Sequence, residues 1–230
     1  MFNFIYDWAA GAYARGKGMN PACTGQITED ITAVKTGCVN FYLYRKGGGI
    51  IAIDAGFGKG VIRRELARLG IRPDSVSALF LTHSDIDHAD GVSVFKNASV
   101  YLSADEERMI RRETARKFGF IYNAELKMPY GLLRQDDEIR IGPIKVRAIE
   151  TPGHTPGSMC YLVDEAFLFS GDAFNLISGK AYPISKRYTM DQKQQIMSIK
   201  KLAGLKGVRA AFTAHWGYTE KFGDVTANYR

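Results

Sequence analysis

The chain has four histidines, and each lies in a short polar motif just after an apolar run. His83 and His88 belong to the segment THSDIDH, His154 lies in TPGHTPGS, and His215 lies in TAHWG. Histidines that served only as general surface or core residues would be scattered without such a pattern. Neutral imidazole is the commonest side-chain metal ligand. The pattern therefore predicts a metal site assembled from loops that are distant in the sequence.

Aspartates accompany these histidines and add oxygen ligands. His83, Asp85 and Asp87 stand at every second position, so an extended loop would direct their side chains to one side. His88 directly follows Asp87 and must point another way. Such a segment can supply ligands to two neighbouring cations. Asp172 follows another apolar run. Nitrogen and oxygen ligands in this number can hold a pair of divalent cations and leave positions open for water.

A segment of strand character precedes four of these residues by a few positions. The segments and the candidate ligands that follow them are 76–81 with His83, 144–149 with His154, 166–170 with Asp172, and 208–213 with His215. Strand ends that meet along one sheet edge are where α/β folds place their sites. We therefore expect the four side chains to meet at such an edge.

The rest of the pattern is that of one α/β domain with two strand-rich halves. Further strands are predicted at 31–35, 38–44, 49–54, 94–102, 138–142 and 159–163, and helices at 61–69 and 191–202. We divide the chain into an aromatic-rich arm, residues 1–30, and a single domain, residues 31–230. Segments 119–137 and 173–190 show neither periodicity nor a motif.

Three local interpretations concern charged residues outside the histidine motifs. The segment from Ser103 to Glu106 has the form of a capping box that opens a helix. The arginines at 111–116 are then interpreted as the solvated face of that helix. Asp90 is interpreted as a cap of the helix after the first motif rather than as a metal ligand.

Composition limits the classes of function. The 230 residues carry a formal net charge of +7, which modestly favours anionic partners or substrates. Because there is no long basic run, a solvated basic surface is favoured over nucleic-acid binding. The three cysteines show no paired spacing, which favours a reducing cytoplasm. We expect no membrane-spanning helix, because no apolar run is long enough. The aromatic arm would suit a homodimer contact.

Together these motifs resemble the metallo-β-lactamase superfamily. The resemblance rests on five ordered segments and covers roughly residues 31–217: they are AIDAG ending at Gly56, THSDIDH, TPGHTPGS, SGD ending at Asp172, and AHWG. It implies a four-layer αββα sandwich with a binuclear metal site in the groove between two mixed sheets. It also implies roles for individual residues. These are His83, Asp85 and His154 as ligands of a first metal, Asp87, His88 and His215 as ligands of a second, Asp172 as the bridge, and Asp54 as the residue that orients the ligand loop by hydrogen bonding.

Asp85 departs from the commonest pattern of the family, which has a histidine there. With two divalent cations and a bridging hydroxide, three carboxylates would make the site neutral, whereas a histidine at 85 would leave it positive. The oxygen-rich first site is more favourable to iron or manganese than a nitrogen-only site would be. Zinc remains the first expectation, iron and manganese stay open, and so does the full occupancy of the first site.

The resemblance implies hydrolysis of a small ester, thioester or lactone by a metal-bridging hydroxide that Asp87 and Asp172 orient. Two alternatives stay open. One is a phosphodiesterase for a small anionic substrate, which would be favoured if Lys180, Lys186 and Arg187 faced the groove. The other is a non-haem iron redox protein of the same fold. Aromatic residues that could line the pocket are Tyr182, Tyr188 and Trp216.

Overall fold

Both faces of the central strands are apolar, so each sheet needs a covering layer on both sides. In β3 (Val39–Lys46), Tyr42 and Tyr44 belong to one buried cluster, whereas Phe41 and Leu43 belong to another. Successive side chains of a strand point to opposite faces. The alternation therefore places the first pair between two sheets and the second pair beneath a helix.

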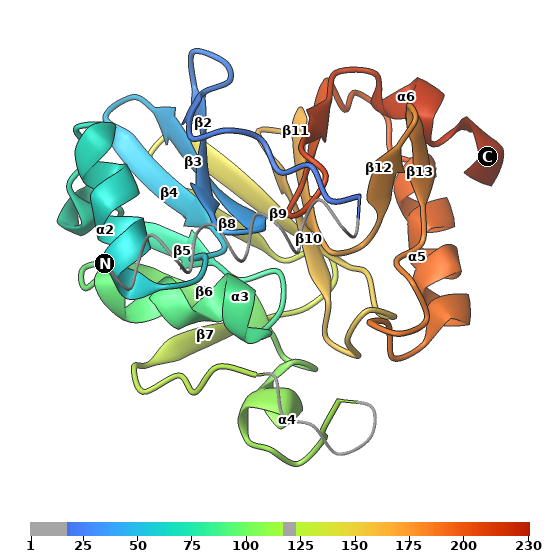
Figure 1. Ribbon diagram of the computed structural model, residues 1–230, viewed down its shortest axis with the longest axis horizontal. Helices are drawn as coiled ribbons and strands as arrows, with labels where there is room; N and C mark the ends of the chain where they lie inside the picture. The colour runs from blue at the N-terminus through green and yellow to red at the C-terminus, as the bar shows by residue number, and fades with distance from the viewer. Residues whose placement is uncertain (1–17, 117–122) are drawn as a thin grey trace.

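The computed structural model describes residues 18–116 and 123–230 and shows this layering. Two mixed sheets pack face to face, with α2 (Lys59–Arg68) on the outer face of one and α5 (Gln192–Ala203) on the outer face of the other (Figure 1). Three separate apolar clusters fill the spaces between the four layers. The predicted αββα sandwich is confirmed.

The first sheet is antiparallel from β1 to β4 and parallel from β4 to β7. Its strands, in spatial order, are β1 (Gly25–Gln26), β2 (Ile31–Thr36), β3, β4 (Gly49–Ile53), β5 (Ala78–Phe80), β6 (Ser99–Ser103) and β7 (Tyr130–Leu133). The predicted strand at 94–102 begins only at Ser99, because a turn in which the Ala98 amide donates to the Phe95 carbonyl precedes it.

The second sheet is antiparallel except where β11 and β14 run parallel. Its strands, in spatial order, are β15 (Tyr218–Thr219), β14 (Ala210–Thr213), β11 (Phe167–Gly171), β10 (Met159–Val163), β9 (Ile144–Glu150) and β8 (Glu138–Ile141). A separate two-stranded sheet lies in the segment that showed no motif; its strands are β12 (Asn175–Ile177) and β13 (Lys180–Tyr182).

The two predicted long helices are present as α2 and α5. Asp191 caps α5, because its Oδ1 accepts a hydrogen bond from the Gln194 amide at 3.0 Å. The other described helices are short: η1 (Pro73–Ser75), α3 (Ile86–Ala89), η2 (Asp90–Val94), α4 (Glu107–Ile110), α6 (Phe222–Val225) and η4 (Ala227–Tyr229). In the described part of the chain no helix could cross a bilayer.

The predicted capping box at residues 103–106 is only half right. Helix α4 begins at Glu107 and the Ser103 hydroxyl accepts from the Asp105 amide at 3.1 Å, but Glu106 does not complete the box. The Glu106 amide does bond to Ser103, but to its backbone carbonyl at 3.1 Å. The Glu106 carboxylate is buried, and it accepts hydrogen bonds from the Ser84 amide at 2.9 Å, the Ser84 hydroxyl at 2.6 Å and the Thr155 hydroxyl at 2.7 Å. A buried carboxylate must find strong donors, and the neighbouring loops supply them.

The predicted cap at Asp90 is also wrong in its target. Its Oδ2 accepts from the Gly58 amide at 2.9 Å, just before α2, rather than from the helix that follows the first motif. Lys59 lies 3.9 Å from its Oδ1. The division at residue 30 stays a prediction; Gly25–Gln26 already pair with β2, and residues 1–17 lie outside the described residues.

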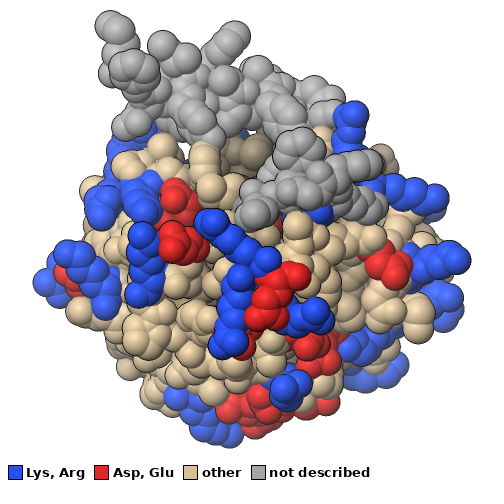
Figure 2. Space-filling view, turned by 90° about the horizontal axis from the view of Figure 1, so that it is seen from below, with Lys and Arg blue, Asp and Glu red and all other residues tan. Residues whose placement is uncertain are grey.

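Charged side chains on one face of the molecule are of mixed sign. Figure 2 shows basic groups separated by acidic ones on the face seen from below Figure 1. Among the described residues, Arg147 lies 3.2 Å from Asp136 and 3.0 Å from Glu165. Local pairing of this kind reduces the field that the net charge of +7 produces at the surface.

Candidate metal centre

The loops that follow four strands bring the seven predicted ligands to one place. The segment after β5, including the start of α3, carries His83, Asp85, Asp87 and His88. The remaining three residues follow β9, β11 and β14, and are His154, Asp172 and His215. Three sets of possible ligand atoms form, each within 4.8 Å: His83, Asp85 and His154; His83, His88 and Asp172; and Asp87, His88 and His215.

The first group of ligand atoms comprises His83, Asp85 and His154. Oδ2 of Asp85 lies 3.6 Å from Nε2 of His83 and 3.4 Å from Nε2 of His154. Ligand atoms about 2.0–2.1 Å from a tetrahedral cation would lie roughly 3.3 Å apart. The spacing of this group therefore fits a divalent cation.

The second group comprises Asp87, His88 and His215. Oδ2 of Asp87 lies 3.4 Å from Nε2 of His215 and 3.8 Å from Nε2 of His88. The side chain of Asp87 is 34% exposed, whereas those of the two histidines are buried. Solvent therefore reaches the cluster on the side of Asp87.

Asp172 lies between the two groups. Its Oδ2 is 3.5 Å from Nε2 of His154 in the first group and 3.6 Å from Nε2 of His215 in the second. Its Oδ1 lies 3.8 Å from Nε2 of His88. A carboxylate in this position can serve both groups at once.

Several buried polar atoms of the cluster have no hydrogen-bond partner among the described residues. Unpaired polar atoms in a protein interior are costly, and a bound cation is one explanation for them. These atoms are Nε2 of His83, Nε2 of His88, Oδ1 of Asp85 and Oδ1 of Asp172. The donor set therefore fits divalent cations in chemistry as well as in spacing.

Hydrogen bonds to the far ring nitrogens orient three of the histidines. Nδ1 of His88 lies 2.8 Å from Asp54 Oδ2, and Nδ1 of His215 lies 2.7 Å from the Cys38 carbonyl. Nδ1 of His83 lies 3.0 Å from the Thr82 hydroxyl. When Nδ1 donates, the lone pair of Nε2 is left for a metal.

The pKa values of the ionisable groups in the cluster differ from those of the same groups in water. Burial raises the pKa of Asp85, but His154 and His83 outweigh it and hold that pKa well below its usual range. Burial lowers the pKa of His154 to about 4. Burial also opposes the charge on His88, but the carboxylates of Asp87, Asp54 and Asp172 raise its pKa to about 9. The carboxylates around His88 therefore favour positive charge at this group.

Arg116 is a functional candidate that the sequence interpretation missed. The solvated-face interpretation fits Arg111, which is exposed beside Glu107, but it is wrong for Arg116. That side chain is buried, and its Nη2 lies 3.0 Å from Oδ2 of Asp85. The helix α4 ends at Ile110, so the chain has already left the helix before Arg116. No local pattern separates this arginine from its exposed neighbours.

The aromatic and basic residues proposed for the pocket lie in different surroundings. The ring of Trp216 lies 5.6 Å from the ring of His215, and Tyr182 is 40% exposed. The Tyr188 carbonyl accepts a hydrogen bond from Arg116 at 2.7 Å. The basic residues Lys180, Lys186 and Arg187 are exposed, whereas the histidines of the cluster are buried.

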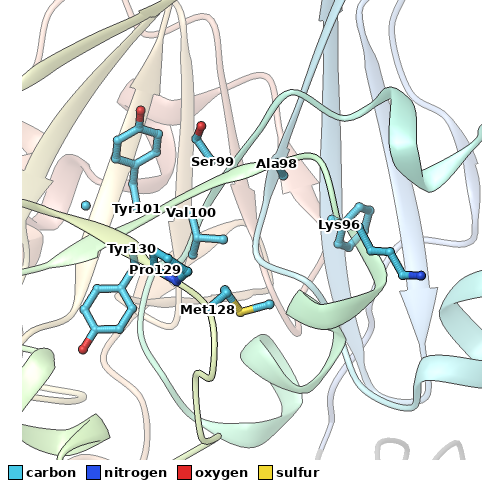
Figure 3. Close-up of a pocket in the computed structure, with 10 residues that line it drawn as sticks. Lys96, Ala98, Ser99, Val100, Tyr101, Met128, Pro129 and Tyr130 are labelled. Atoms are coloured by element: carbon cyan, nitrogen blue, oxygen red, sulfur yellow. The ribbon is translucent and has the colours of Figure 1, made fainter.

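A pocket of about 470 Å³ lies beside β6 and β7. The rings of Tyr101 and Tyr130 border it on one side and Lys96 lies on the other (Figure 3). It shares no lining residue with the metal-ligand cluster. The pocket is therefore not the cleft of the candidate metal centre.

Solved structures have the same fold. A metallo-beta-lactamase family protein from Thermus thermophilus superposes with a TM-score of 0.68 at 21% identity, covering 88% of this chain and 79% of that one. A B3 metallo-beta-lactamase with an active-site glutamic acid gives a TM-score of 0.71 at 19% identity, covering 95% and 90%. At these identities the likeness extends to the fold.

Sequence relatives point the same way. A probable metallo-hydrolase of Methanocaldococcus jannaschii is 31% identical over 70% of this chain and 68% of its own length. A hydroxyacylglutathione hydrolase of Glaesserella parasuis is 26% identical over 60% of this chain, but the match spans only 51% of that enzyme. The family model of the metallo-beta-lactamase superfamily matches residues 35–215. The chain, with its shared fold and its buried cluster of histidines and aspartates, therefore belongs to the metallo-beta-lactamase superfamily of metallo-hydrolases.

Proposed function

We propose that the protein is a binuclear metal-dependent hydrolase that cleaves a small thioester, ester or lactone. The observation that carries the proposal is the position of Asp172, whose Oδ2 lies 3.5 Å from His154 and 3.6 Å from His215. One carboxylate thus contacts both ligand groups. This arrangement supports a pair of cations that share a ligand.

His83, Asp85 and His154 would hold one cation, and Asp87, His88 and His215 would hold the other, with Asp172 between them. Two bound cations would lower the pKa of a water molecule at the site and polarise the substrate carbonyl. The spacing of the ligands suits zinc, and the carboxylate at position 85 also suits iron or manganese.

The protein's own side chains have separate tasks in this proposal. Asp172 and Asp87 would orient the attacking water. Asp87 is the partly exposed member, so the substrate would approach from its side. The buried imidazoles of His88 and His154 exclude bulk solvent from the other sides, which strengthens the electrostatic interactions within the site.

Relatives support a thioester as the first substrate to test. The hydroxyacylglutathione hydrolase of Glaesserella parasuis is named for a thioester of glutathione, and a human relative at 31% identity is named as a similar protein. The phosphodiesterase alternative rests on the net charge of +7 and would be favoured if Lys180, Lys186 and Arg187 faced the groove. These side chains are exposed, and the alternative stays open. We propose a small molecule as the partner of the site; the homodimer and the cytoplasmic setting stay predictions.

The experiment is reconstitution of chelator-treated protein with Zn²⁺, Fe²⁺ or Mn²⁺, followed by rate measurements on matched substrates. S-Lactoylglutathione tests thioesters, γ-butyrolactone tests lactones, and bis(p-nitrophenyl) phosphate tests phosphodiesters. We expect thioester hydrolysis to return with metal. Asp172→Asn should lower the metal-restored rate by about 100-fold or more, the scale on which one stabilising group acts.

Asp224→Asn is the matched control, because Asp224 lies on α6, away from the ligand loops. It should keep the wild-type rate. Faster cleavage of the phosphodiester than of the thioester, with the same metal, would reject the proposed substrate class. Equal rates with and without metal would reject the proposed metal dependence.

A further inference from the structure

The two ligand groups differ in the cation that lies beside them. Arg116 is only 8% exposed and lies against the first group. A guanidinium keeps its charge at every physiological pH. The first group therefore already contains a fixed positive charge before any metal binds.

The guanidinium contacts the ligand atoms themselves. Nη2 of Arg116 lies 3.0 Å from Oδ2 of Asp85 and 3.5 Å from Nε2 of His154. Both atoms belong to the set that would surround the first cation. Oδ2 is also the Asp85 oxygen that faces Nε2 of His83, at 3.6 Å. A cation that used this oxygen would share it with Arg116 or displace the guanidinium.

Two further hydrogen bonds hold Arg116 in place. Its Nη1 donates to the His154 carbonyl at 2.6 Å, and its Nη2 donates to the Tyr188 carbonyl at 2.7 Å. Displacing the guanidinium would break contacts with two separate loops. The competition with a metal is therefore built into the packing of the site.

The second group has carboxylates where the first group has an arginine. The second group contains the carboxylate of Asp87 and shares that of Asp172 with the first group. A third carboxylate, that of Asp54, lies 2.8 Å from Nδ1 of His88 and supports this ligand from behind. In the first group, Nδ1 of His154 is buried and has no hydrogen-bond partner among the described residues. A supporting acceptor on the far nitrogen strengthens a histidine ligand, so the second group is also better supported.

From these contacts we propose that Arg116 is a resident counter-ion of Asp85 that makes the first group the weaker cation site. The protein then binds its two divalent cations in sequence, the second group filling before the first. This inference rests on the binuclear centre proposed above. It also accounts for the carboxylate at position 85, since a histidine there would leave Arg116 without this counter-ion.

The test is a titration of metal-free protein with Zn²⁺ in competition with a chromophoric chelator, with bound metal counted by elemental analysis. Wild-type protein should show two steps whose affinities differ by about tenfold or more, since one unit charge at this range changes binding by at least that factor. Asp87→Asn should remove the tight step. Asp85→Asn should remove the weak step and leave the tight one.

Arg116→Gln removes the charge and keeps a polar group that can donate to a carbonyl. In this variant the zinc affinity of the weak step should rise by about tenfold, and the affinity of the tight step should not change. Arg116→Lys keeps the charge and should keep the two steps apart. Arg111→Gln is the matched control, because Arg111 is an exposed arginine of the same segment, and it should behave as wild type.

The inference would be overturned if wild-type protein bound its two zinc ions with equal affinity. It would also be overturned if the affinity of the weak step were lower in Arg116→Gln than in wild-type protein. If Arg116→Gln did not fold, as judged by circular dichroism, the wild-type and Arg116→Lys titrations would still decide it, because both must show two separate steps. Failure of wild-type protein to bind any zinc would instead contradict the proposed metal centre.

Discussion

At the scale of single residues, Asp54 holds the loop that carries His83 and His88 by contacts with Thr82 and His88. Its Oδ1 accepts from the Thr82 amide at 2.8 Å, its Oδ2 accepts from the Thr82 hydroxyl at 2.9 Å, and Nδ1 of His88 lies 2.8 Å from Oδ2. Its φ of +62° lies in the left-handed region, which aspartate and asparagine tolerate better than most residues. Asp54 therefore orients His88 without itself facing the proposed cations.

Asp54→Asn should lower zinc affinity by about 10- to 100-fold, the usual effect of losing a partner behind a histidine ligand. Asparagine tolerates the same backbone conformation, so the fold should persist. The measurement is chelator competition at pH 7, with Asp224→Asn as the control. An unchanged affinity would show that the contact with His88 does not support metal binding.

At the scale of elements, close packing of loops sets the positions of the ligands. A Cβ at Gly157 would lie 2.1 Å from the Glu106 amide nitrogen, and a Cβ at Gly153 would lie 2.4 Å from that of Gln195. The loop that carries His154 is therefore held between the segment before α4 and the start of α5. Such approaches require glycine, because backbone atoms cannot move aside cheaply.

Gly157→Ala should destabilise the protein by about 1–3 kcal/mol or more, because the added methyl group forces the His154 loop away from Glu106. Zinc affinity should fall as well. Urea unfolding measures the first effect and chelator competition the second. Gly25→Ala is the control, because nothing lies within 4 Å of its added Cβ. Equal stability of the two variants would contradict the expected clash.

At the scale of the whole molecule, Asp164 joins the two sheets at the edge opposite the ligand loops. It lies in the β10–β11 turn of the second sheet, and its Oδ2 accepts from Tyr44 at 2.8 Å and Lys46 at 2.6 Å, both on β3 of the first sheet. Its Oδ1 accepts from the Lys145 amide at 2.9 Å. Burial raises the pKa of Asp164, but these donors outweigh it and lower that pKa below its usual value.

Asp164→Asn should reduce the free energy of unfolding at pH 7 by about 1.5–3 kcal/mol, the range for hydrogen bonds to a charged group. Because the folded-state pKa is lowered, the carboxylate stabilises the protein above its unfolded pKa of about 3.9, and this contribution disappears as pH falls through the folded-state value. Denaturant unfolding of both proteins from pH 7 to pH 3 measures the difference.

Lys46→Met is the matched control for the contacts of Asp164 between the sheets. The Lys46 side chain is 45% exposed, so its loss should cost only about 0–1 kcal/mol. The free energies of unfolding of wild type and Asp164→Asn should become more similar in acid. If they did not, the charge of Asp164 would not be what joins the sheets.

Metal removal should lower the stability of the whole domain, because the candidate ligands come from both sheets. Zinc at 100 times its dissociation constant should stabilise the folded state by about 2.7 kcal/mol for one site. Thermal unfolding with and without chelator measures this effect, and it should be smaller in Asp87→Asn. A midpoint independent of zinc would contradict binding to the folded protein.

From the sequence, apolar periodicity predicted a single α/β domain, because periodicity is a local property. The resemblance carried by the five ordered motifs implied the sandwich. The sequence also placed seven candidate ligands after the right strands, and the structure brings them together, although their roles as ligands stay predictions. The same local reasoning failed for charged residues whose partners are distant. Glu106 has the spacing of a cap, yet it bonds to Ser84 and Thr155 across the site.

Tertiary structure alone decided the surroundings of Asp85. From the sequence, the aspartate at position 85 bore on the choice of metal and on whether the first site is fully occupied. The fold buries Arg116 against it, 31 positions later in the chain, with Nη2 3.0 Å from the carboxylate. Periodicity and motif spacing determine which element a residue occupies, but the partner of a buried charge depends on how separate loops pack, and only the folded chain specifies that packing.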